Sequence, residues 1–125
     1  MGRIYPLGFG STLIPAKGMI NIAVDLKTIF VPEWLVVPSM IGEFFLIEDI
    51  LINGENILTS PTAGGAFSEF VKEKVKLKTK RAKPMQHGGK EISINVTNLS
   101  DKDHNFTACL FGTSQLDSPQ VVERS

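Results

Sequence analysis

The residues of this chain best suited to chemistry are its two histidines, His87 and His104, and its single cysteine, Cys109. Both histidines lie in polar stretches that predict loops, whereas Cys109 lies in an apolar stretch that predicts a strand. A zinc site requires three or four ligands at suitable spacing, and these residues do not provide that spacing. We therefore expect no metal and no cofactor, and we interpret Cys109 as a packing residue and not as a nucleophile.

Carboxylates and hydroxyls form no catalytic pattern either. Glu48 and Asp49 are adjacent in a predicted strand, so their side chains should point to opposite faces and could not act as a hydrolytic pair. Ser39 and Ser68 lack the Gly-x-Ser-x-Gly context of a nucleophile elbow, and the glycines of residues 61–65 lack the Lys-Ser/Thr sequel of a phosphate loop. We expect no catalytic residues, and hence a protein that is not an enzyme.

A regular lysine pattern is the clearest signal for partner binding. Between residues 70 and 80, one parity carries Lys72, Lys74, Lys76, Lys78 and Lys80, and the other carries Val71, Val75, Leu77 and Thr79. Alternate side chains of a strand point to opposite faces, so the pattern predicts a β-strand with one buried and one basic side. The basic side could be solvated, could meet an acidic surface of a partner or sister subunit, or could touch nucleic acid.

Charge is balanced over the whole chain and uneven along it. Basic and acidic residues number 13 each among the 125 residues, so no overall field attracts nucleic acid or an anionic membrane. Residues 72–90 nevertheless hold eight Lys and Arg against one Glu, whereas residues 33–55 hold five acidic residues and no basic one. This asymmetry favours contacts between copies or with a complementary partner. Direct nucleic-acid binding is not expected, because it would require exposed aromatic residues for base stacking, and the aromatic residues lie in apolar strands that predict core positions.

The N-terminal residues 1–18 combine many glycines and prolines with many apolar side chains. The breakers predict an extended arm without regular structure, docked on its own domain or on a neighbouring subunit. We expect its contacts to come from Ile4, Tyr5, Leu7, Phe9, Leu13 and Ile14. Truncation of the arm should then leave the rest of the domain folded. No secretory signal and no membrane-spanning stretch are recognisable, so we expect synthesis in a host cytoplasm and no membrane partner.

The elements that position these residues read as short strands separated by turns. Alternating patterns occur at residues 20–26 and 91–97, and apolar runs at residues 33–37, 44–52 and 105–112. Asn53-Gly54 is a strong hairpin signal. With no convincing amphipathic helix, the pattern predicts an all-β, single jelly-roll-like sandwich of about seven or eight antiparallel strands. We expect this domain to span residues 19–114, followed by a polar tail over residues 115–125.

Several segments resemble small structural proteins of tailed bacteriophages. The resemblance is carried by residues 30–39 (FVPEWLVVPS), 45–54 (FLIEDILING), 66–69 (AFSE), 94–98 (INVTN), 105–108 (NFTA) and 111–113 (FGT). It implies a single jelly-roll protein of the virion that is structural and oligomeric. The lysine-rich stretch and residues 81–89 depart from this pattern, which leaves open a capsid shell, a capsid-surface cement or a tail and fibre role.

Together these features predict a capsid cement or decoration protein that bridges capsid subunits. Its expected partners are its own copies, with a trimer favoured, and the major capsid protein or other virion proteins. The expected contact residues are those of the N-terminal arm together with Lys72, Lys74, Lys76 and Lys78. A carbohydrate-binding β-sandwich is the alternative from another class. That function would require exposed aromatic residues, for which Tyr5 and Trp34 are the candidates.

Overall fold

The protein is described from a computed structural model, which covers residues 4–77 and 89–114. Regular structure in this part of the chain is almost entirely β-strand, which confirms the predicted all-β class. The elements in chain order are β1 (Ile4–Ile14), β2 (Met19–Val36), α1 (Ser39–Gly42), β3 (Phe45–Ile52), β4 (Glu55–Asn56), β5 (Thr62–Ala63), the 3-10 turn η1 (Gly64–Phe67), β6 (Gly89–Asn98) and β7 (His104–Ser114).

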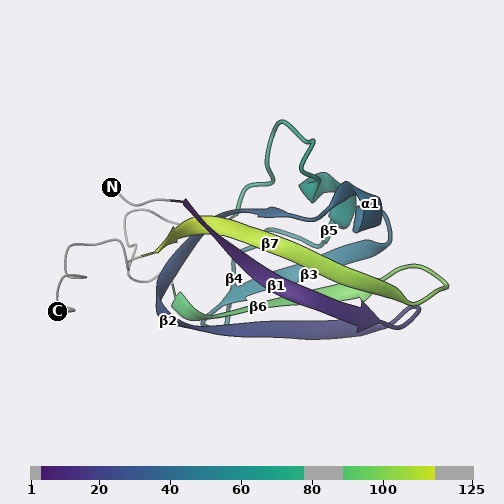
Figure 1. The fold of residues 1–125 in the computed structure, drawn as a ribbon, viewed down its shortest axis with the longest axis horizontal. Helices are drawn as coiled ribbons and strands as arrows, with labels where there is room; N and C mark the ends of the chain where they lie inside the picture. The colour runs from purple at the N-terminus through teal and green to yellow at the C-terminus, as the bar shows by residue number, and fades with distance from the viewer. Residues whose placement is uncertain (1–3, 78–88, 115–125) are drawn as a thin grey trace.

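The seven strands form one continuous antiparallel ladder that folds over into two layers. The strand order is β1-β7-β2-β6-β3-β4, with β5 also paired to β3. Residues 19–25 of β2 pair with β6, whereas residues 30–36 pair with β7. In Figure 1, β2 follows the lower side of the molecule, turns upward at the left and returns along the top. One layer is therefore β1, β7 and the second half of β2, and the other is the first half of β2 with β6, β3, β4 and β5.

Two turns cross between the layers at the same end of the sandwich, which we call the crossover end. Residues 15–18 join β1 to β2, and residues 99–103 join β6 to β7. The turns are hydrogen-bonded to each other. The backbone N–H of Lys17 donates to the carbonyl oxygen of Ser100 at 3.1 Å, and that of Ala16 donates to Oδ1 of Asp103 at 2.9 Å. Both turns lie at the right in Figure 1.

Asn98 is a fully buried polar residue at the crossover end. Its Nδ2 donates to the carbonyl oxygens of Ile14 at 3.0 Å and Lys102 at 2.8 Å, and its Oδ1 accepts from the N–H of Ser100 at 2.8 Å. A buried amide left without partners costs about 1–3 kcal/mol. This one is fully used, and it ties the end of β1 to the turn between β6 and β7.

The hydrophobic core fills the space between the two layers. Its most deeply buried members are Ile14, Val37, Phe45, Ile47, Ile50, Ile94, Val96, Phe106 and Leu110, each with 0% exposure. Phe45 and Phe106 meet edge to face, with ring centroids 5.0 Å apart. The alternation of residues 91–97 is confirmed, because Ile92, Ile94 and Val96 all face the core.

The predicted hairpin at Asn53-Gly54 is also confirmed. Asn53 has φ of 50° and Gly54 has φ of 87°, the positive values that a tight hairpin turn requires at both central residues. Ile52 and Glu55 pair across the turn. By contrast, the expected separate strand at residues 33–37 is wrong. Residues 33–36 belong to the long strand β2, which runs through Pro32 with a register shift between Pro32 and Trp34.

The prediction of irregular backbone for the N-terminal arm is wrong over residues 4–14. This stretch is β1, which pairs with β7 from Ile4↔Thr113 to Ile14↔His104. The glycines and the proline are tolerated because β1 is an edge strand with a bulge. Its register shifts between Gly8 and Ser11, where Gly10 has φ of 76°. The predicted polar tail at residues 115–125 lies outside the described residues.

Candidate interaction surfaces

The residues expected to bind partners through the N-terminal arm are mostly used within their own domain. Phe9 and Ile14 belong to the core, at 6% and 0% exposure, and Tyr5 and Leu7 pack against it while partly buried. Of the expected contact residues whose side chains are described, Leu13 alone is strongly exposed, at 57%. The side chain of Ile4 is outside the described set. The arm therefore docks on its own sheet, and Leu13 is the residue of this group that remains open to a partner.

The lysine segment (residues 70–77) does not form the predicted strand. Its backbone makes one isolated bridge, Leu77 with Leu58, and otherwise has no sheet partner among the described residues. The alternation of exposure follows the prediction in part, since Val71, Val75 and Leu77 are half-buried and not buried, and Glu73 on the same parity is exposed. Lys72, Lys74 and Lys76 are exposed, while Val75 and Leu77 are partly buried against the core. The apolar side chains of the segment thus pack against the rest of the domain, although its backbone does not join a sheet. Lys78 lies outside the described residues.

The start of the lysine segment is held to α1 by Glu69. The Oε1 of Glu69 accepts a hydrogen bond from the N–H of Ser39 at 2.9 Å, and its Oε2 accepts from the Ser39 hydroxyl at 3.4 Å. Hydrogen bonds from its own backbone N–H and from Ser39 hold the pKa of the Glu69 carboxyl below its usual value, and the nearby Lys74 charge adds to this. Beneath this link, Gly42 and Gly64 approach closely. A Cβ on Gly64 would lie 2.6 Å from the Gly42 carbonyl oxygen.

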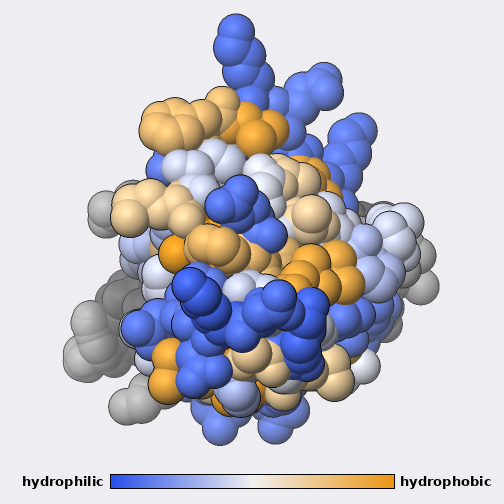
Figure 2. Space-filling view, turned by 90° about the vertical axis from the view of Figure 1, so that its right-hand side faces the viewer, coloured by the Kyte–Doolittle hydropathy of each residue, from blue (hydrophilic) through white to orange (hydrophobic). Residues whose placement is uncertain are grey.

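Exposed apolar side chains gather at the crossover end. The large apolar residues with the highest exposure are Leu13 (57%), Met19 (65%), Met40 (83%), Phe70 (76%) and Leu99 (45%), and we call this set the apolar end. Leu13 and Met19 flank one crossover turn and Leu99 begins the other. Figure 2 looks onto this end and shows orange and tan groups between blue hydrophilic ones.

Backbone hydrogen bonds connect Leu99 of the apolar end to α1, which carries Met40. The N–H of Leu99 donates to the carbonyl oxygen of Phe44 at 2.7 Å, and the N–H of Phe44 donates to that of Ile41 at 3.0 Å. Ile41 follows Met40 in α1, and Phe70 follows Glu69, which binds the N-terminus of the same turn of helix. Sequence reasoning missed this surface, because its members come from separate segments and no single stretch has an apolar exposed pattern.

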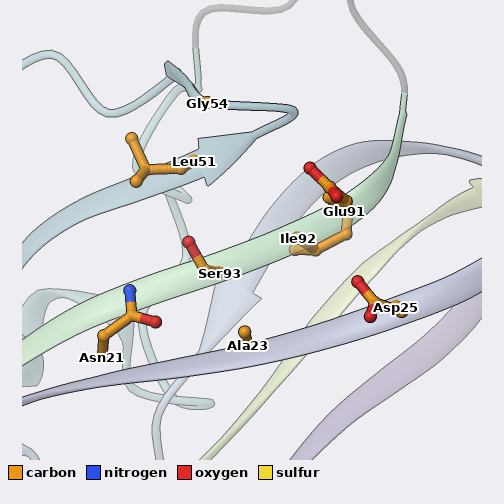
Figure 3. Close-up of a pocket in the computed structure, with 8 residues that line it drawn as sticks. All are labelled: Asn21, Ala23, Asp25, Leu51, Gly54, Glu91, Ile92 and Ser93. Atoms are coloured by element: carbon orange, nitrogen blue, oxygen red, sulfur yellow. The ribbon is translucent and has the colours of Figure 1, made fainter.

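A second surface is the polar outer face of β2, β6 and β3. Its centre is a shallow trough of about 290 Å³, lined by Asn21, Ala23, Asp25, Leu51, Gly54, Glu91, Ile92 and Ser93. Figure 3 shows the small residues Ala23 and Ser93 in the middle, with the carboxylates of Asp25 and Glu91 at one end and Asn21 at the other. Asp25 and Glu91 are direct cross-strand partners.

The prediction that Glu48 and Asp49 point to opposite faces is wrong. The register of β3 against β6 shifts between Ile47 and Asp49, and this bulge turns both carboxylates outward. Asp49 Oδ1 accepts from Asn95 Nδ2 at 2.6 Å, and Glu48 Oε2 accepts from Thr97 Oγ1 at 2.7 Å. Both carboxylates therefore belong to the same polar outer face as Asp25 and Glu91.

Two residues whose side chains could take part in catalysis or metal binding, His104 and Cys109, are packed against other groups of the fold. His104 stacks on Phe44, with ring centroids 3.8 Å apart and planes 9° from parallel, and its Nε2 lies 3.2 Å from the Ser100 hydroxyl. Burial raises the pKa of the Cys109 thiol, which disfavours the reactive thiolate. Within residues 4–77 and 89–114 no group of three or more His, Cys, Asp and Glu could hold a metal ion. His87 is outside these ranges.

Two aromatic residues that the sequence predicted to lie in the core are instead on the outer side of the β7–β2 layer. Trp34 and Phe111 stack with ring centroids 5.3 Å apart and planes 10° from parallel, and both are half-buried. Their neighbours of opposite parity, Leu35 and Leu110, fill the core instead. The bulge between Pro32 and Trp34 sets this parity, and it could not be read from the apolar run.

No protein-family model matches the chain, and no curated protein or solved structure is significantly similar to it. In the part of the chain that the structure describes, no helix has the length and apolar character needed to cross a membrane. The described surfaces are therefore the basis for a functional proposal.

Proposed function

We propose that this chain is a structural protein of a virus particle, a cement or decoration protein that bridges capsid subunits. The observation that carries the proposal is the apolar end, where Met40 and Phe70 are 83% and 76% exposed. Exposed apolar groups that gather on one surface mark protein contacts, and aromatic residues and Met are enriched in such contacts. That the particle is a capsid rests on the resemblance of residues 30–39, 45–54, 66–69, 94–98, 105–108 and 111–113 to small structural proteins of tailed bacteriophages.

Such a protein acts by adding buried area between neighbouring subunits, without a reaction. Fully burying one Phe or Met side chain contributes about 1.5–3 kcal/mol. A few such side chains per copy, multiplied over a shell, stabilise the shell against internal pressure. A rigid sandwich suits this role, because its short turns and its satisfied Asn98 hold the contact residues in place before binding.

The test is association with particles from the virus that encodes the chain. We expect the protein to co-sediment with density-gradient-purified particles, and the variant Met40→Asp/Phe70→Asp to be lost from them while it remains folded by circular dichroism. The control variant Thr59→Asp/Ser60→Asp places the same two charges at exposed positions outside the apolar end and should bind as the unmodified chain does. Absence of the protein from purified particles would refute the virion proposal.

A carbohydrate-binding function is a second candidate, favoured by the Trp34–Phe111 pair on the outer side of its layer. Flat aromatic rings on a sheet face can stack against the apolar face of a sugar. A glycan-binding screen with Trp34→Ala as the control distinguishes this candidate. Saturable binding that disappears in Trp34→Ala would favour it over assembly.

A further inference from the structure

Among the described side chains, the polar outer face of β2, β6 and β3 carries negative charge only. Asp25 on β2 and Glu91 on β6 are exposed and sit directly opposite each other in the register. Like charges in this arrangement destabilise a strand pair. Neither carboxylate makes a salt bridge with a described residue, because the one salt bridge found in the described ranges joins Lys17 to Asp101 at the crossover end.

Glu48 and Asp49 add two more carboxylates to the same face. Asn95 Nδ2 donates to Asp49 and its Oδ1 accepts from Asn21 Nδ2 at 2.9 Å, so a hydrogen-bonded row of two amides and one carboxylate crosses the three strands. These bonds orient the carboxylates and do not neutralise them. No described side chain of the face is basic. We call these residues, Asp25, Glu48, Asp49 and Glu91, the acidic face.

The lysine segment presents the complementary charge. Lys72, Lys74 and Lys76 are exposed, while Val75 and Leu77 attach the segment to the core. Lys74 lies close enough to Glu69 to lower the pKa of that carboxyl, whereas Lys72 and Lys76 have no ionic partner among the described residues. These two are therefore the lysines most available to another molecule.

The spacing of the two charge sets is compatible. On β6, Glu91 is four residues from Asn95, which holds Asp49, a separation of about 13 Å along a strand. Lys72 and Lys76 are also four residues apart and can span up to about 13 Å. One lysine can thus approach the Asp25–Glu91 pair while the other approaches Asp49. The trough between them has a floor of small residues, Ala23 and Ser93, which leaves room for long side chains (Figure 3).

We propose that the acidic face binds the lysine segment of a second copy of this chain. Within one copy the two surfaces lie on different sides. Figure 1 shows the segment after η1 at the top, and the paired first half of β2 and β6 at the bottom. The contact is therefore heterologous, with a different surface from each subunit, and such contacts close into rings when the rotation permits. This inference goes beyond the proposed function, which concerns contact with capsid subunits, and names the surfaces through which copies of the chain associate.

The test is sedimentation velocity of charge-reversed variants. Asp25→Lys/Glu91→Lys reverses the acidic face, and Lys72→Glu/Lys76→Glu reverses the lysine segment. Each variant alone should dissociate at concentrations at least about tenfold above those at which the unmodified chain does, because each now places like charges in contact. An equimolar mixture of the two should form hetero-oligomers, since one reversed surface of each variant matches the other. Raising the salt concentration should weaken the unmodified assembly.

A charge reversal outside the two proposed surfaces provides the control. Lys102→Glu reverses a single exposed charge in the turn at residues 99–103 and should leave the mass distribution unchanged. A monomeric unmodified chain at all concentrations, or variants that associate as the unmodified chain does, would overturn the inference. So would an effect of Lys72→Glu/Lys76→Glu on nucleic-acid binding alone. Particle association is measured in a separate experiment. If the chain binds particles but its copies do not make this contact, the inference is refuted and the proposed function is not.

Discussion

Strand β1 and the lysine segment each adopt the structure that its sequence does not predict. β1 contains one proline and two glycines, yet it forms eleven residues of strand paired along β7. The lysine segment alternates regularly between lysine and apolar residues, yet its backbone makes a single isolated bridge. The difference lies in the partner. β7 offers β1 a long open edge, whereas β4, nearest to the bridge at Leu58, has only two residues. A strand thus requires an available edge as well as a pattern.

Among single substitutions, the largest effect in this comparison is expected from Ile14→Ala. Ile14 has 0% exposure at the end of β1, so truncation leaves a cavity in the core and should cost roughly 2–5 kcal/mol of unfolding free energy. Its neighbour Leu13 is 57% exposed, and Leu13→Ala should cost no more than about 0.5 kcal/mol. Urea unfolding measures both. Equal, small effects would mean that β1 is a detachable arm after all.

Deleting residues 1–14 sharpens the same point. This deletion removes Phe9 and Ile14 from the core and exposes the edge of β7. We expect loss of cooperative unfolding, in contrast to the sequence-based expectation that the sandwich would survive truncation. Circular dichroism with thermal melting provides the measurement, and a folded, cooperative product would restore the arm interpretation.

In the lysine segment, Val75→Ala should have an intermediate effect. Val75 is partly buried against the core, so loss of its two methyl groups should cost about 1 kcal/mol. Lys76→Glu, one residue along, changes an exposed side chain and should stay within about 0.5 kcal/mol of the unmodified monomer. If Lys76→Glu were the more destabilising variant in dilute solution, the assignment of faces in this segment would be reversed.

The smallest effect concerns the link between Glu69 and Ser39. The pKa of Glu69 is lowered in the folded state, so its contribution to stability is present above the pKa of the unfolded chain and is lost as pH falls through the folded pKa. Glu69→Gln removes this titration. Its unfolding free energy should therefore fall less steeply below about pH 4 than that of the unmodified chain. Parallel pH profiles for the two proteins would show that the hydrogen bonds to Ser39 contribute nothing.

Local patterns predicted most of the sandwich and little of the candidate surfaces. The alternation of residues 91–97 and the Asn53-Gly54 turn depend on neighbouring residues, and both predictions are confirmed. The outward position of Trp34 and the shared face of Glu48 and Asp49 depend on bulges, which reverse parity without a distinct sequence signal. The apolar end depends on segments 13–19, 40, 70 and 99 meeting in space, which only the strand order determines.

Hydrogen–deuterium exchange at two protein concentrations tests the central claim most directly, namely that β1 belongs to the body while the lysine segment is a contact surface. In dilute solution the amides of residues 4–14 should exchange slowly and those of residues 70–77 rapidly, because the latter have few backbone hydrogen bonds among the described residues. At a concentration where copies associate, residues 70–77 and 91–95 should gain protection together, while residues 4–14 stay unchanged. Rapid exchange of residues 4–14 in dilute solution, or protection of residues 70–77 that does not depend on concentration, would contradict this account.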